Sequence, residues 1–124
     1  GYVTTLLGQD AVSLIANHDV NTPLFLYLAF TGPHAPYQAP DVYLEQYKHI
    51  KDPSVQAYAA MISAIDDEVG HVIQALEQKE MLSNSVIIFH SDNGGPRSAM
   101  FTGEVSTAGQ TIPADNGPYR NGKG

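Results

Sequence analysis

A short apolar segment that ends in four turn-forming residues constrains the fold of this chain most. Residues 85–91 form a run of strand type, and the sequence Asp-Asn-Gly-Gly follows at 92–95. Such apolar runs are typical of strands buried in a parallel sheet, and polar groups that follow these strands emerge at the sheet edge where ligands bind. Asp92 and Asn93 offer adjacent carboxylate and amide oxygens, which suit a hard cation such as calcium. The segment predicts half of a metal site at the edge of an α/β sheet.

A second apolar run and a long amphipathic helix complete the pattern. Residues 24–30 are continuously apolar, as expected for a buried strand, and residues 58–76 keep one apolar face at helical spacing. Strand, helix and strand in this order predict a mostly parallel sheet flanked by helices. Further helical segments are expected over residues 4–17 and 41–50, and Asp52 and Pro53 are expected to begin the long helix.

Composition excludes several classes of function. The chain has 124 residues, no cysteine, and a net charge of −7 with only six Lys and Arg residues. The charge argues against a nucleic-acid partner, and the longest apolar run, residues 24–30, is too short to span a membrane. The Gly-, Ser- and Thr-rich stretch 96–114 is expected to be a loop insertion. Both ends look like cuts in a longer chain.

Three loops carry residues that could form one site. His34 lies in the proline-rich loop 31–40 after the first strand, Asp92 and Asn93 follow the second, and Lys123 lies in a turn-rich tail. Loops after parallel strands gather at one sheet edge, so metal, imidazole and ammonium are expected to converge. Together they would form an electropositive pocket for a tetrahedral oxyanion such as sulfate or phosphate.

Each of these residues also has a simpler interpretation. Asp-Asn-Gly-Gly at 92–95 could be a plain turn, His34 a structural residue, and Lys123 a solvated tail residue. The acidic run 66–68 is interpreted as a solvated helix face rather than as paired catalytic acids.

Several motifs in order resemble the sulfatase family, and more narrowly its arylsulfatase B type. The similarity covers nearly the whole chain and is carried by Pro23–Phe30, Pro33–Pro40, Tyr43–Pro53, Tyr58–Ser63, Ser91–Gly95 and Pro118–Gly124. The resemblance implies an alkaline-phosphatase-like α/β core, with residues 1–124 forming part of a single catalytic domain.

The resemblance also implies roles and partners. Asp92 and Asn93 would bind one calcium ion, His34 would contact the sulfate or its leaving oxygen, and Lys123 would hold a sulfate oxygen. The nucleophile would be a formylglycine, made from a C/S-x-P-x-R motif that is expected upstream and does not occur in these residues. The 124 residues alone are therefore expected to show no turnover. The implied substrate is a sulfated small molecule or glycan, and the implied location is secreted, lysosomal or periplasmic.

Two alternatives stay open at this point. A phosphodiesterase or phosphonate hydrolase of the same superfamily would use a similar pocket, because metal and cations alone do not separate sulfate from phosphate. A catalytically inactive, binding-only homologue or fragment is the alternative from a different class. The nucleophile would distinguish the first of these, since a Ser or Thr without the modification motif points to phosphate.

Overall fold

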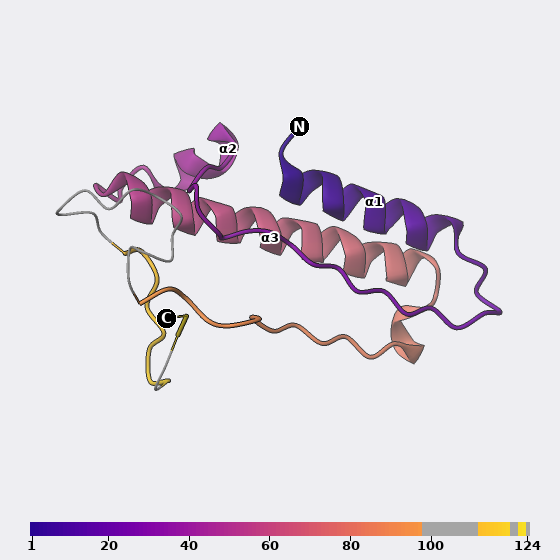
Figure 1. Ribbon diagram of the computed structural model, residues 1–124. Helices are drawn as coiled ribbons and strands as arrows, with labels where there is room; N and C mark the ends of the chain where they lie inside the picture. The colour runs from indigo at the N-terminus through magenta and orange to yellow at the C-terminus, as the bar shows by residue number, and fades with distance from the viewer. Residues whose placement is uncertain (98–111, 120–121, 124) are drawn as a thin grey trace. The chain divides into compact units, whose positions relative to one another are not determined.

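Helices dominate the computed structural model, which describes residues 1–97, 112–119 and 122–123 (Figure 1). The chain divides into two compact units, the first containing residues 1–31 and 63–88 and the second residues 32–62 and 89–124. No helix among the described residues is long and apolar enough to cross a membrane. The elements are the helices α1 (Val3–Asn17), α2 (Asp41–Leu44) and α3 (Pro53–Gln78), with short 3-10 turns at Glu45–Tyr47 and Leu82–Asn84.

The long helix α3 begins and ends where local chemistry requires it. The backbone amides of Ser54 and Val55 donate to Asp52 Oδ1 at 2.9 and 3.1 Å, so the predicted cap is confirmed. After the helix, Glu80 takes a left-handed conformation with φ of 58°, and Met81 N donates to the Leu76 carbonyl at 2.9 Å. This backward hydrogen bond is the Schellman arrangement that stops a helix.

In the first unit, α1 packs along the second half of α3. The buried residues of α1 are Thr4, Gly8, Ala11 and Ile15, whose spacing places them on one helical face. Ile15 joins Ala75 and Leu76 in the apolar core of this unit. At the same end, Lys79 Nζ donates to the Ala16 carbonyl at 3.2 Å. Figure 1 shows the two helices side by side.

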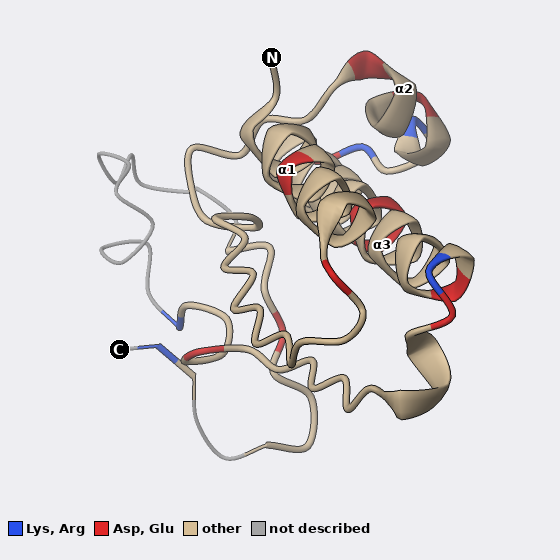
Figure 2. Ribbon diagram, turned by 90° about the vertical axis from the view of Figure 1, so that its right-hand side faces the viewer, with Lys and Arg blue, Asp and Glu red and all other residues tan. Residues whose placement is uncertain are grey.

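The expectation that residues 66–68 form a solvated face is wrong for Glu68. Figure 2 shows acidic positions in red along α3. Asp66 and Asp67 are exposed, but Glu68 is only 3% exposed. Its carboxylate lies against Gly8 of α1, and its Oε2 is 3.3 Å from His71 Nδ1. A buried carboxylate requires a partner, and the missing side chain at Gly8 gives it room. Helical periodicity had placed Glu68 on the solvated face, and the approach of α1 buries it.

The helices of the predicted α/β fold are confirmed, whereas the parallel sheet is not. Residues 24–30 and 85–91 run as extended chain, but no backbone hydrogen bond joins them among the described residues. A ladder needs a neighbouring backbone about 4.8 Å away, and the described residues supply none to these segments. Apolar side chains of both segments are also uncovered, since Phe25 and Val86 are 92% and 90% exposed.

Two further expectations keep their status as predictions. Most of the expected loop insertion 96–114 lies outside the described residues, since only residues 96–97 and 112–114 of it are described. The single catalytic domain stays a prediction, and within these 124 residues the chain packs as two compact units.

Alanine substitutions at Gly8 and Gly70 are expected to change the free energy of unfolding in opposite directions, because only the Cβ at Gly8 would meet another side chain. In Gly8→Ala, the new Cβ would lie 2.7 Å from Glu68 Cβ, so we expect the free energy of unfolding to fall by about 1–3 kcal/mol. In Gly70→Ala, the new Cβ has nothing within 4 Å, and the gain in helix propensity should raise that free energy by about 0.5–1 kcal/mol. Thermal and denaturant unfolding of the two variants measures both; a Gly8→Ala variant as stable as the parent would contradict this packing.

Candidate active site

His34 has a ring orientation set by its own loop. Its Nδ1 lies 2.7 Å from the carbonyl oxygen of Ala35. A carbonyl only accepts hydrogen bonds, so Nδ1 carries the proton and donates. In the neutral imidazole the lone pair is then on Nε2, which is the atom that faces outward from this contact. The peptide bonds before Pro33 and Pro36 are both cis, and His34 is exposed.

The structure brings Lys123 to this imidazole. Lys123 Nζ lies 3.4 Å from His34 Nε2, although the two residues are 89 positions apart in the sequence. Because Nε2 holds the lone pair, the ammonium is the donor of this hydrogen bond. The pair presents an ammonium and an imidazole nitrogen at one point of the surface, as the convergence of loops predicted.

The backbone of Lys123 is held by the segment that follows Asp92 and Asn93. Lys123 N donates to the Gly95 carbonyl at 3.0 Å, and Arg97 N donates to the Lys123 carbonyl at 3.0 Å. These two hydrogen bonds make an isolated parallel bridge between Pro96 and Lys123. The bridge places the backbone of Lys123 beside the Asp-Asn-Gly-Gly turn.

The turn itself keeps its two oxygen-bearing side chains at the surface. Asp92 and Asn93 are exposed, and Asn93 Nδ2 donates to Asp92 Oδ2 at 2.6 Å. Gly94 N donates to Ser91 Oγ at 3.0 Å, and Gly94 has a φ of 72°, a conformation that glycine adopts without strain. The side-chain nitrogen of Asn93 therefore points at the Asp92 carboxylate, whereas the side-chain oxygen of Asn93 takes no part in this hydrogen bond.

The donor set fits part of a calcium site. Calcium takes six to eight oxygen ligands, and Asp92 and Asn93 supply a carboxylate and an amide oxygen of the right kind. Among the described residues, no cluster of three or more His, Asp or Glu side chains could hold a metal by itself. These two residues therefore fit as a partial shell that other ligands must complete.

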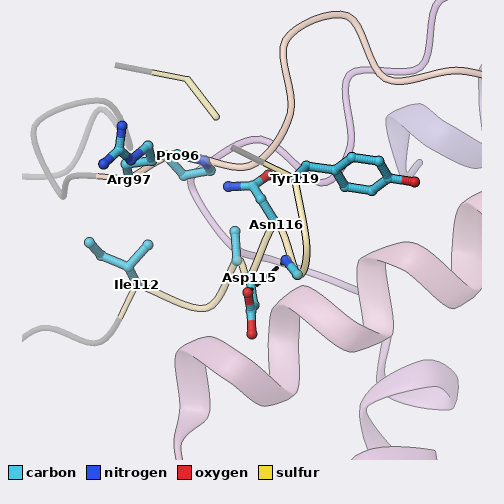
Figure 3. A pocket seen from close by; sticks show the side chains of 8 residues that line it. Pro96, Arg97, Ile112, Asp115, Asn116 and Tyr119 are labelled. Atoms are coloured by element: carbon cyan, nitrogen blue, oxygen red, sulfur yellow. Dashed lines mark hydrogen bonds between the residues drawn. The ribbon is translucent and has the colours of Figure 1, made fainter. Parts of the chain in front are cut away.

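A hollow next to the lysine was not predicted from the sequence. In Figure 3, Arg97 and Ile112 lie on one side of it, and the ring of Tyr119 points away from them. Asp115 is engaged in its own turn, where its Oδ1 accepts from Gly117 N at 2.8 Å. The hollow has a volume of about 340 Å³ and is lined by Pro96, Arg97, Ile112, Ala114, Asp115, Asn116, Gly117 and Tyr119.

Asn116 is the residue of this region that sequence reasoning missed. Its Oδ1 accepts from Gly95 N at 2.8 Å, and its Nδ2 donates to the Gly95 carbonyl at 3.1 Å. In the sequence it is one of several turn formers in the Asp-Asn-Gly-Pro stretch 115–118, so the only available signal was its turn propensity. Its partner is 21 residues away and could not be identified locally.

The start of α3 supports the histidine loop. The ring of Tyr37 packs edge-on against that of Tyr58, with centroids 5.8 Å apart and an interplanar angle of 83°. Burial raises the pKa of Tyr58 above its ordinary value, because the phenolate would lose solvation. This contact anchors the proline-rich loop three residues after His34.

Comparisons with a family model and with known proteins both match this chain to sulfatases. Residues 1–124 match the family model described as Sulfatase. The chain is 41% identical over 98 residues to arylsulfatase J of Mus musculus, covering 79% of this chain and 16% of that protein. It is 28% identical over 92 residues to N-acetylgalactosamine-6-sulfatase of Homo sapiens, covering 74% of this chain and 16% of that protein.

A solved structure is similar over nearly the same range. The crystal structure of Ps i-CgsB in complex with k-i-k-neocarrahexaose superposes with a TM-score of 0.81 at 35% identity. The match covers 99% of this chain and 25% of that one. This chain thus spans between a sixth and a quarter of the length of these relatives.

Proposed function

We propose that this chain, which belongs to the sulfatase family, carries part of the active site of a sulfuric ester hydrolase. The observation that carries the proposal is the 3.4 Å contact between Lys123 Nζ and His34 Nε2, beside a turn that bears two oxygen ligands. A fixed ammonium beside an imidazole suits a tetrahedral sulfate, because negative charge shifts between the sulfate oxygens as the ester bond breaks.

The ammonium of Lys123 and the imidazole of His34 take different tasks in this proposal. The Lys123 ammonium donates to His34 Nε2 and can donate instead to a sulfate oxygen, which neutralises its charge. His34 keeps one proton on Nδ1, toward the Ala35 carbonyl. Once the Lys123 ammonium turns to the sulfate, Nε2 is free to take up a proton from solvent and pass it to the leaving oxygen. After that transfer, the ring is again the neutral tautomer that its loop stabilises.

Asp92 and Asn93 are proposed to hold one calcium ion. A bound calcium would supply a positive charge that stabilises oxygens of the reacting group. These two residues would orient the ion through their side-chain oxygens, and the Ser91–Gly94 turn would keep them at the surface. The nucleophile is proposed to be a formylglycine outside these residues.

The substrate is proposed to be a sulfate ester on a sugar. The names of two relatives support this: one is an N-acetylgalactosamine-6-sulfatase, and the other was crystallised with k-i-k-neocarrahexaose.

The parallel sheet belongs to the same proposal. The exposed apolar side chains of 24–30 and 85–91 are those expected of buried strands, and further strands and helices of a complete sulfatase would cover them.

Substitution of Lys123 and His34 tests the reaction. In the full-length protein, Lys123→Ala should lower kcat/KM for 4-nitrophenyl sulfate roughly 10²–10³-fold, as loss of one fixed charge-stabilising donor does. His34→Ala should lower it roughly 10²–10⁴-fold, the usual contribution of proton transfer. The control Lys48→Ala removes an exposed lysine that pairs with Glu45 and should leave the rate unchanged.

The same assay separates the alternatives. Parallel measurements with 4-nitrophenyl phosphate and bis(4-nitrophenyl) phosphate should give much lower rates than the sulfate, and a sulfated oligosaccharide should release sulfate. A protein that prefers either phosphate ester would be a phosphohydrolase, and one that binds sulfated sugars without turnover would be a binding-only homologue. Either result would overturn the proposal.

Removal of one oxygen ligand tests the metal. Asp92→Ala should weaken calcium binding by more than roughly tenfold, since loss of even an outer partner of a metal site costs 10–100-fold. The matched control is Asp67→Ala, which removes an exposed carboxylate from α3. Elemental analysis and calcium titration of the full-length variants measure the effect, and equal calcium content in both would remove Asp92 from the site.

A further inference from the structure

The side-chain amide of Asn116 pairs with both backbone groups of one residue, Gly95. Gly95 N donates to Asn116 Oδ1 at 2.8 Å, and Asn116 Nδ2 donates to the Gly95 carbonyl at 3.1 Å. The carboxamide thus imitates the N–H and C=O pair that a neighbouring strand would offer. The Gly95 carbonyl also accepts from Lys123 N at 3.0 Å, so one oxygen joins the amide to the lysine backbone.

The space around this amide is filled by glycine backbone. A Cβ on Gly122 would collide with both Asn116 Nδ2 and the Gly95 carbonyl oxygen, and a Cβ on Gly94 would lie 3.1 Å from Asn116 Oδ1. A Cβ on Gly95 would collide with the side chain of Ala114. The amide therefore lies between two backbones that approach it closely, one after Asn93 and one before Lys123.

Few side chains can replace this group. The contact needs a donor and an acceptor on one short planar group, which only an amide or a protonated carboxylic acid provides. An ionised carboxylate of the same shape would still accept from Gly95 N, but it would face the Gly95 carbonyl with a second negative oxygen. Alanine would leave both Gly95 groups without this partner.

We propose that Asn116 is a positioning residue that fixes the calcium-binding turn relative to the Lys123 ammonium. It acts through Gly95, which lies two residues after Asn93 and accepts a hydrogen bond from Lys123 N, and it touches neither substrate nor metal itself. This inference rests on the proposed function, because the spacing it controls matters only if Asp92, Asn93 and Lys123 act on one sulfate. A displacement of about 1 Å in such an arrangement costs roughly 100-fold in rate.

The first test compares Asn116→Ala and Asn116→Asp in the full-length protein. At neutral pH both variants should lower kcat for 4-nitrophenyl sulfate roughly 10–100-fold and weaken calcium binding to a similar degree. Their pH profiles should differ. As the pH falls, protonation of the introduced carboxyl restores a donor and an acceptor, so the activity of Asn116→Asp relative to the parent should rise while that of Asn116→Ala stays flat.

Matched controls keep this test decisive. Asn84→Asp introduces the same charge at an exposed asparagine and should change neither kcat nor its pH dependence. Unfolding measurements verify that the nearly isosteric Asn116→Asp is folded. Parent-like kcat and calcium binding in both Asn116 variants, or the same flat pH ratio in both, would overturn the proposal.

Hydrogen exchange separates failure of this inference from failure of the proposed function. The amide of Gly95 should exchange faster in Asn116→Ala, because its acceptor is lost, and this readout needs no turnover. If the parent protein hydrolyses no sulfate ester, the sulfatase proposal fails, and exchange alone decides the contact. Unchanged exchange across residues 91–97 would then show that Asn116 does not hold the turn.

Discussion

Two backbone hydrogen bonds, from Lys123 N to the Gly95 carbonyl and from Arg97 N to the Lys123 carbonyl, join parts of the second unit that are distant in sequence. This bridge holds the backbone of Lys123 beside the Asp-Asn-Gly-Gly turn. With it, the lysine backbone is fixed and only its side chain has to reach His34. Backbone pairing therefore does the positioning, and the side chains remain available for chemistry.

Glycine is what makes this close approach possible. Gly95 and Gly122 lie where any Cβ would collide with a neighbouring residue, and Gly94 adopts a left-handed conformation. A glycine also permits a close approach in the first unit, where Gly8 of α1 makes room for the buried Glu68 of α3. In both places the absence of a side chain lets a polar group approach the glycine closely, and that polar group has a hydrogen-bond partner nearby.

The local part of the fold could be predicted because each feature has a nearby cause. Asp52 caps α3 through amides two and three residues away, and the apolar face of α3 follows from helical periodicity. Glu68 was misassigned since its burial comes from α1, which periodicity within α3 does not describe. The sheet stays a prediction because the apolar runs 24–30 and 85–91 specify strand character but not the partners with which they pair.

Residue chemistry along the chain was sufficient to indicate the family, the candidate residues His34, Asp92, Asn93 and Lys123, and the kind of ligand they suit. Turn formers, apolar runs and caps act over a few positions, so they can be recognised in a linear sequence. Tertiary structure alone decided that Lys123 Nζ meets His34 Nε2 and that the Asn116 amide pairs with Gly95. These contacts span 89 and 21 positions, and their geometry depends on how separate segments pack, which no local pattern encodes.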